Sequence, residues 1–156
     1  FMLKEIMEQP QTIEDTFRGR LAVEDISEFF GEININPQII RDINKISIVA
    51  CGTSYHAGLI GKFLFESLSG ISTETDIGSE YRYRDLIIDD KTLLIAISQS
   101  GETADTIAPL REAKKHCAKT LAICNVMGST ITRRRAAPSQ ATWAIGMTQA
   151  TRCPRA

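Results

Sequence analysis

The sequence predicts an α/β layered fold with a parallel sheet, because short apolar runs alternate with segments of helical periodicity. The runs Ile46–Ala50 and Thr92–Ile97 are brief and rich in β-branched residues, which is typical of buried strands. Helical periodicity follows each run, over Tyr55–Ser69 and over Thr103–His116. Strands and helices at this spacing are expected of βαβ units with right-handed crossovers.

The chain before the first strand is predicted to be mostly helical. Leu3–Arg18 has the pattern of a helix in two pieces, with Pro10 tolerated at a first-turn position and Gly19 as a stop. We therefore expect a helical linker arm over residues 1–22. A polar, mixed stretch then leads to a short helix at Gln38–Asn44.

The later elements repeat the same unit. Gly70 closes the helix that follows the first strand, and Thr73–Ile77 is a weaker strand. Thr120–Cys124 is another short apolar strand after the Thr103–His116 helix. The segment 23–132 is thus expected to form one domain.

Composition is ordinary for a globular protein: of 156 residues, 43% are hydrophobic and 24% charged, and the net charge is −1. These values exclude disordered and fibrous classes and suggest neither a nucleic-acid nor a membrane partner. No apolar run approaches the roughly 20 residues of a membrane span. The four cysteines form no C-x-x-C pair and no histidine stands at metal-ligand spacing, so we expect no metal, no cofactor and no disulfide framework, and a reduced cytoplasmic setting.

The end of the chain differs in composition from the rest. No Asp or Glu follows Glu112, and residues 133–156 contain five Arg. We expect 133–156 to be a divergent tail, either unrelated or from a shifted reading frame. The first residue is Phe1 rather than methionine, which suggests that the chain is a truncated piece of a longer protein.

Two hydroxyl-rich loops occupy equivalent places in the predicted fold. Cys51-Gly52-Thr53-Ser54 follows the first strand, and Ser98-Gln99-Ser100-Gly101-Glu102-Thr103 follows the strand at 92–97. Each loop opens a helix, and helix N-termini at the carboxyl ends of parallel strands offer free N–H groups and a favourable dipole to anions. The loops therefore point to a phosphate site, with helix capping by Ser100 and Thr103 as the alternative.

Other loop motifs are excluded by spacing. No G-x-G-x-x-G is present, and Gly61-Lys62 lacks the glycine five residues earlier that a P-loop requires. No G-x-S-x-G surrounds Ser98 or Ser100, which argues against a serine hydrolase.

Four motifs together resemble the glucosamine-6-phosphate synthase family. They are CGTSY at 51–55, SEYRYR at 79–84, SQSGETADT at 98–106 and LAICN at 121–125, and the leading Lys4-Glu5-Ile6 and Glu8-Gln9-Pro10 also resemble the segment that joins the family's glutaminase and isomerase domains. The resemblance covers roughly residues 1–132. It implies a flavodoxin-like, three-layer sugar-isomerase (SIS) domain, the first of two in that family.

The resemblance also implies a function. The family makes glucosamine 6-phosphate from fructose 6-phosphate and glutamine, and its members form homodimers. By this resemblance the phosphate of fructose 6-phosphate or glucosamine 6-phosphate would be bound by Ser98, Gln99, Ser100 and Thr103, and the sugar side would be lined by Gly52, Thr53 and Ser54. The family's catalytic groups lie outside this region, so the chain alone is expected to be inactive. A non-enzymatic phosphosugar-sensing module is the alternative.

Four other features have ordinary explanations. Cys51 lacks a predicted activating base and is expected to be structural. His56 is expected to be a packing or surface residue, and His116 to complement the helix dipole at a C-terminus. The cluster Glu80–Arg84 could contact an anionic substrate, form a subunit contact or be a salt-bridged surface turn.

Overall fold

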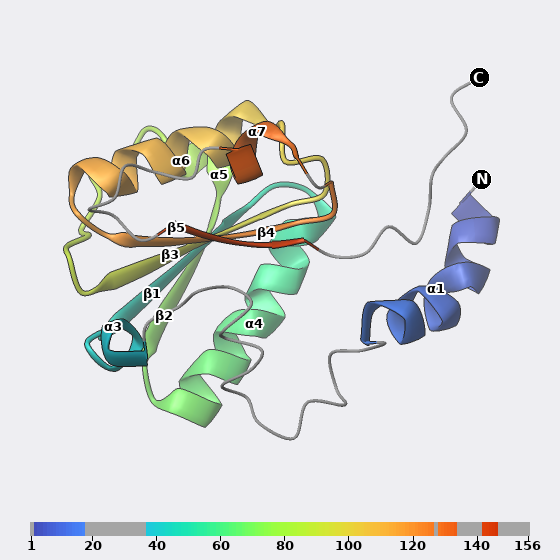
Figure 1. Cartoon of the computed structure of the whole chain (residues 1–156), viewed down its shortest axis with the longest axis horizontal. Helices are drawn as coiled ribbons and strands as arrows, with labels where there is room; N and C mark the ends of the chain where they lie inside the picture. Colours follow the sequence, from blue (N-terminus) through green and yellow to red (C-terminus); the bar gives the residue numbers. More distant parts are fainter. Residues whose placement is uncertain (1, 18–36, 127, 134–141, 147–156) are drawn as a thin grey trace.

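A computed structural model describes residues 2–17, 37–126, 128–133 and 142–146 and places five parallel strands in one sheet (Figure 1). The strand order is β2-β1-β3-β4-β5, the order of flavodoxin-like folds. The strands are β1 (Lys45–Ala50), β2 (Ser72–Ile77), β3 (Thr92–Ser98), β4 (Lys119–Cys124) and β5 (Thr142–Gly146). The predicted α/β fold with a parallel sheet is confirmed.

Helices cover both faces of the sheet and complete three layers (Figure 1). Helix α4 lies on one face, and α5, α6 and α7 lie on the other. A short helix, α3, precedes β1, and α1 stands before residues 18–36. The bounds are α1 (Met2–Phe17), α3 (Pro37–Arg41), α4 (Thr53–Ser69), α5 (Gly78–Tyr81), α6 (Ala104–Lys115) and α7 (Thr130–Arg133).

Alternation along the strands divides the core into two clusters. Val49 and Leu94 belong to the cluster that includes Leu110 of α6, whereas their neighbours Ile48 and Ile95 belong to the cluster packed against Phe65 of α4. Successive side chains of a strand point to opposite faces, so near-continuous apolar runs serve both layers. This is why the strand runs lack the polar alternation of a sheet with one solvated face.

Helix α1 differs from the predicted two pieces, because it is continuous from Met2 to Phe17 with Pro10 inside. Proline removes a single N–H donor, the one that would bond the carbonyl of Ile6, and the rest of the sixteen-residue helix keeps its pattern. Its apolar side chains are exposed, including Met2, Leu3 and Met7. The predicted stop at Gly19 lies outside the described residues.

Three elements were not predicted: α5, α7 and the edge strand β5. The last of these lies within the segment expected to be a divergent tail, and it pairs in parallel with β4 from Thr120↔Thr142 to Cys124↔Gly146. The rest of that segment, except Arg133, lies outside the described residues, and a frame shift there remains a prediction.

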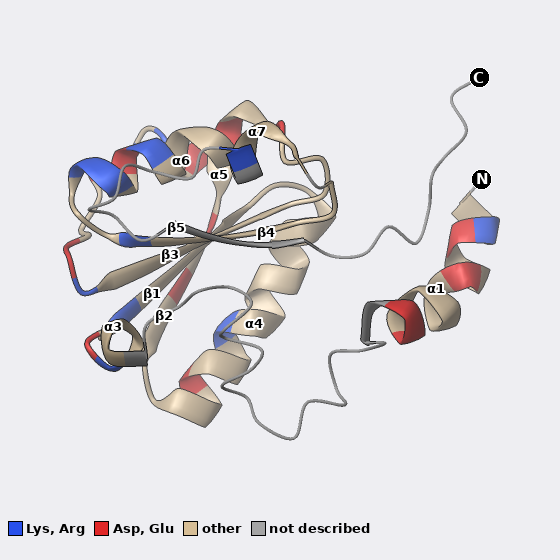
Figure 2. Cartoon of the chain, viewed as in Figure 1, with Lys and Arg blue, Asp and Glu red and all other residues tan. Residues whose placement is uncertain are grey.

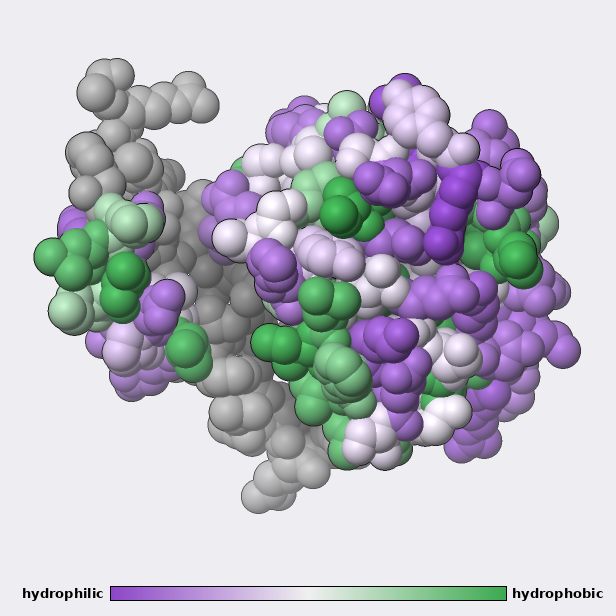
Figure 3. Space-filling view, turned by 180° about the vertical axis from the view of Figure 1, so that it is seen from behind, coloured by the Kyte–Doolittle hydropathy of each residue, from purple (hydrophilic) through white to green (hydrophobic). Residues whose placement is uncertain are grey.

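The outer face of α4 carries an exposed apolar stripe, seen as a green patch in Figure 3. Its members are 54% to 83% exposed: Ile60, Phe63, Leu64 and Leu68. Among the described helices, none combines the length and the apolar character needed to cross a membrane.

Candidate functional site

The two hydroxyl-rich loops meet where the crossover connections diverge. Strands β1 and β3 are neighbours, with Ala50 paired to Ile97 at their carboxyl ends. The chain leaves β1 for α4 on one face of the sheet and leaves β3 for α6 on the other (Figure 1). In open parallel sheets, ligands bind at such a switch point, outside the carboxyl ends of the strands.

The loop after β3 is a tight turn built around Ser98 and Gly101. The Gly101 N–H donates to Ser98 Oγ at 3.0 Å, and Gly101 adopts φ +67°, a left-handed conformation that favours glycine. Ser98 is the last residue of β3 and is only 6% exposed. One residue on, the Glu102 N–H donates to Ser100 Oγ at 3.2 Å. The serine hydroxyls thus accept bonds from the loop itself and keep their own hydrogens to donate.

Thr103 is the N-cap residue of α6, but its side chain does not cap the helix. Its Oγ1 lies 3.5 Å from Ser98 Oγ, and its carbonyl accepts from the N–H groups of Thr106 and Ile107, both at 3.0 Å. The N–H groups before Thr106, at the very start of α6, have no acceptor within the helix. Helix N-termini also carry positive partial charge, so this end of α6 suits an anion.

The loop after β1 is more open. Gly52 precedes α4 with φ +59° and ψ −135°, and the space where its Cβ would be is free of other atoms within 4 Å. Gly52 and Thr53 are exposed, whereas Ser54 is half-buried. The Tyr55 N–H donates to the Gly52 carbonyl at 3.1 Å and begins the helix.

Buried contacts connect the two loops beneath the surface. Thr106 Oγ1 of α6 lies 4.0 Å from Cys51 Sγ, a distance at the limit of a hydrogen bond to sulfur. A Cβ at Gly78 would stand 2.5 Å from the Asp105 carbonyl oxygen and 3.0 Å from Cys51 Sγ. Only glycine at position 78 therefore allows α5 to lie this close to the start of α6 and to the loop after β1. Cys51 is therefore half-buried and packs between the two loops, which agrees with the structural role expected of it.

The site edge carries few charges. Figure 2 shows Lys, Arg, Asp and Glu gathered along α6 and at the amino ends of the strands, whereas the loops at the carboxyl ends are mostly uncharged. An anion bound at these loops would thus be held mainly by hydroxyls, N–H groups and the helix dipole. Among the residues that the structure describes, no group of three His, Cys, Asp or Glu is placed to hold a metal.

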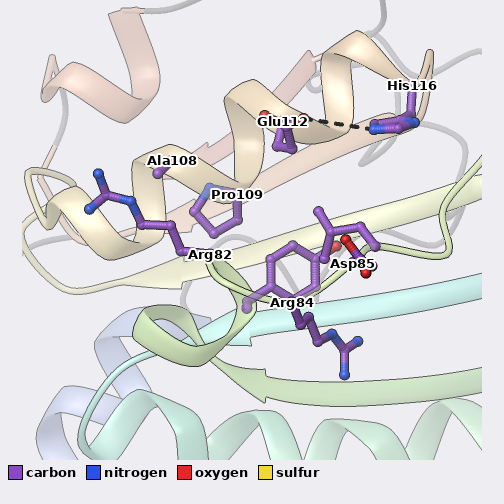
Figure 4. A pocket seen from close by; sticks show the side chains of 9 residues that line it. Arg82, Arg84, Asp85, Ala108, Pro109, Glu112 and His116 are labelled. Atoms are coloured by element: carbon purple, nitrogen blue, oxygen red, sulfur yellow. Dashed lines mark ion pairs between the residues drawn. The ribbon is translucent and has the colours of Figure 1, made fainter.

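A cavity of about 490 Å³ lies beside the site, between α6 and the chain after α5 (Figure 4). Its Arg side chains do not converge: in Figure 4, Arg82 and Arg84 point to opposite sides. Arg84 pairs with Asp76 at 2.8 Å and with Glu74 at 3.3 Å. Arg82 pairs with Asp105 at 3.5 Å. These pairs favour the salt-bridged surface turn for Glu80–Arg84 over an anion site.

Tyr81 explains why that turn is fixed. Its side chain is 1% exposed and belongs to the core cluster on the α6 face, with the Arg84 guanidinium 5.4 Å from its ring centroid. Burial raises the pKa of the Tyr81 phenol. Burial also raises the pKa of the Asp76 carboxyl, against the opposing charge of Arg84.

The two histidines lie outside the loops that form the site. His56, in the first turn of α4, is exposed and stands edge-to-face with Tyr55, with ring centroids 5.8 Å apart. His116 Nε2 lies 3.7 Å from Glu112 Oε1 at the end of α6. Both agree with the surface and helix-end positions expected of them.

Comparison with known proteins identifies the domain that carries these loops. The sequence matches the SIS domain over residues 39–149. The chain belongs to the SIS domain family. The matched residues include β5.

Sequence relatives of this SIS domain are long enzymes. The chain is 56% identical over 134 residues to glutamine--fructose-6-phosphate aminotransferase [isomerizing] of Clostridium tetani, and 50% identical over 133 residues to the protein of that name from Symbiobacterium thermophilum. In both cases the match covers 85% of this chain. The chain spans 22% of the length of these curated relatives.

Solved structures agree on the fold of the SIS domain. The C-terminal domain of glucosamine-fructose-6-phosphate aminotransferase from Francisella tularensis superposes with a TM-score of 0.76 and 36% identity, covering 94% of this chain and 39% of that one. Tagatose-6-phosphate ketose/aldose isomerase from Escherichia coli superposes with a TM-score of 0.73, 92% and 39% coverage, and 19% identity, which shows the fold alone.

Sequence reasoning found both loops of the SIS domain but missed what lies behind the second one. Asn125, Ser129 and Thr130 follow β4 and lie against the 98–103 loop. Neither Asn125, in the LAICN motif, nor Glu102, within the loop, was predicted to have a role in the site. Asn125 donates to the Gln99 carbonyl and Glu102 accepts from Thr130 of α7, and sequence spacing does not reveal partners so far apart in the chain.

Proposed function

We propose that this chain is the sugar-phosphate-binding part of a glutamine--fructose-6-phosphate aminotransferase (isomerizing), which makes glucosamine 6-phosphate from fructose 6-phosphate and glutamine. The observation that carries the proposal is the turn at the start of α6, where Ser98 Oγ and Thr103 Oγ1 lie 3.5 Å apart beside free helix N–H groups. The names and identities of the relatives support the same substrate class.

In this proposal the phosphate is bound by side chains and N–H groups of the loop after β3. Ser100 and Thr103 donate hydroxyl hydrogens, Gln99 adds its exposed amide, and Ser98 sets the turn. The sugar lies toward the open loop after β1, which consists of Gly52, Thr53 and Ser54. Hydrogen bonds to a phosphate are charge-assisted and are stronger than neutral ones.

The test is a titration of the chain with fructose 6-phosphate and with glucosamine 6-phosphate, followed by calorimetry. Ser100→Ala and Thr103→Val should each weaken binding about 10-fold to 100-fold, because each removes a donor to a charged group. Ser67→Ala, an exposed change at the far end of α4, is the matched control and should bind as the unaltered chain does. Absence of saturable binding at millimolar ligand would refute the proposal.

Turnover is proposed to require the remainder of the longer enzyme. The chain alone, given glutamine and fructose 6-phosphate, should form no glucosamine 6-phosphate, and detection of product would contradict this. We also propose that the protein is cytoplasmic and that the chain is part of a homodimer, as the resemblance to the glucosamine-6-phosphate synthase family implies. The described cysteines Cys51, Cys117 and Cys124 are free thiols, in keeping with a reducing compartment. Light scattering would distinguish a dimer from the 17.3 kDa monomer.

A further inference from the structure

The loop Ser98–Thr103 can bind phosphate only if its peptide groups are held in one orientation. Two of its carbonyls accept hydrogen bonds from the connection that follows β4, taken here to include Thr130 and Ile131 at the start of α7. The Asn125 N–H donates to the Gln99 carbonyl at 3.3 Å, and the Ile131 N–H donates to the Gly101 carbonyl at 3.1 Å. In a trans peptide the carbonyl and the following N–H point in opposite directions. The N–H of Ser100 is therefore turned away from that connection.

The same connection also packs against the loop without spare room. A Cβ at Gly101 would overlap Ser129 Oγ and would lie 2.9 Å from Cys124 Sγ. Cys124 Sγ and Ser129 Oγ are themselves 3.2 Å apart and buried. The loop thus rests on a wall formed by the end of β4 and the start of α7.

Glu102 makes a side-chain bond between the loop and this wall. Its Oε1 accepts the N–H of Thr130, the first residue of α7, at 2.7 Å, a short distance typical of a charge-assisted hydrogen bond. The neighbouring N–H, that of Ile131, is the one that binds the Gly101 carbonyl. The carboxylate therefore fixes the position of the peptide that orients the loop.

A carboxylate inside a phosphate loop would ordinarily repel the ligand. Glu102 lies between Ser100 and Thr103 in sequence, yet its charge is directed to Thr130. Hydrogen bonds from the Thr130 side chain and backbone, with a contribution from Arg133, lower the pKa of the Glu102 carboxyl. The negative charge is thus stabilised on the wall side of the loop.

We propose that Glu102 is a positioning residue that holds the Ser98–Thr103 loop in its phosphate-binding conformation by anchoring it to Thr130 at the start of α7. This inference rests on the proposed function for the effect on sugar-phosphate binding. The geometric part, that the anchor orders the loop, is independent of any ligand.

The test compares Glu102→Ala with Glu102→Gln, because glutamine keeps an acceptor oxygen while alanine removes it. Glu102→Ala should weaken binding of fructose 6-phosphate about tenfold, and Glu102→Gln should stay within about threefold of the unaltered chain. Glu112→Ala, a carboxylate at the other end of α6, is the matched control and should leave binding unchanged.

Amide NMR without ligand gives the second readout. Glu102→Ala should shift the Thr130 amide signal and speed hydrogen exchange at Asn125 and Ile131, and Glu102→Gln should restore both. Unchanged exchange in Glu102→Ala would overturn the inference whether or not sugar phosphate binds. Tighter binding by Glu102→Ala would also overturn it, since that result means the carboxylate only repels the ligand. If the unaltered chain binds no sugar phosphate while exchange responds as expected, the proposed function fails and the anchor stands.

Discussion

The two loops at the candidate site are built differently, although each joins a parallel strand to a helix. The loop after β3 is supported from behind: Gly101 is buried, and backbone carbonyls at Gln99 and Gly101 are bonded to the chain after β4. The loop after β1 is exposed at Gly52 and Thr53, and a Cβ added at Gly52 would meet no atom within 4 Å outside its chain neighbours.

This difference separates two roles that a sugar-phosphate site needs. A phosphate presents the same charged oxygens in every sugar phosphate, so a preformed turn can serve it with little reorganisation. The sugar varies in shape, and an open loop leaves room for it. Under the proposed function, the β3 loop would set affinity and the β1 loop would tolerate change.

The largest expected contrast is between Gly101→Ala and Gly52→Ala. The first substitution combines a left-handed backbone with overlap against Ser129, whose Cβ would be only 2.7 Å away, so rotating the serine hydroxyl gives no relief. We expect Gly101→Ala to cost about 2–5 kcal/mol of unfolding free energy. Gly52→Ala meets only backbone strain, about 1–3 kcal/mol. Urea unfolding of both variants measures the difference.

Ser129→Gly provides the control for that contrast, because it removes the two Ser129 atoms that the new methyl group of Gly101→Ala would meet and leaves only Cys124 Sγ close to it. Combined with Gly101→Ala, it should recover part of the lost stability, whereas it should not help Gly52→Ala. Equal costs for the two single variants would show that the loops are equally adaptable and would remove the distinction drawn between them.

A smaller contrast is expected between Ser98→Ala and Thr53→Ala. Ser98 Oγ is the acceptor for the buried Gly101 N–H, and its loss leaves that N–H without its partner. The expected cost is about 1–3 kcal/mol. Thr53 is exposed in the first turn of α4, and its change to alanine should stay within about 0.5 kcal/mol. The denaturant midpoints of the two variants, compared where the dependence of unfolding free energy on denaturant is unchanged, measure both stability costs. A cost for Thr53→Ala equal to that for Ser98→Ala would mean that the loop after β1 also contributes to the stability of the fold.

The sequence was sufficient to predict strands β1 to β4 and the two loops, but not the edge strand β5. Apolar runs such as Ile46–Ala50 and Thr92–Ile97 are buried on both faces, so their composition alone identifies them as strands. Glycine and hydroxyl residues directly after those runs identify the loops. Both features depend only on residues that are close together in the chain, so they can be recognised from a single sequence.

Other elements depend on contacts that are not local. The strand Thr142–Gly146 is short and follows a basic segment, and its pairing with β4 decides its conformation. The four residues of α5 are too few for a periodic pattern, and Gly78 is needed there because α6 and Cys51 come close. Likewise, the partners of Glu102 stand about 28 residues away in the chain.

The smallest expected effect is a pH dependence of the supported loop. Because the folded pKa of Glu102 is lowered, its carboxylate stabilises the fold above the ordinary value of 4.5, and that contribution is lost as the pH falls through the folded pKa. The stability of the unaltered chain relative to Glu102→Gln should therefore be constant near neutrality and decline below about pH 4.5.

Unfolding experiments from pH 7 to pH 3 measure this change better than binding does, since a sugar phosphate itself titrates near pH 6. Because Glu102 is exposed, salt should reduce the effect without changing its sign. A stability difference that grows as the pH falls would mean that the protonated carboxyl is the better anchor, and the supported loop would then owe its order to the Gln99 and Gly101 carbonyls alone.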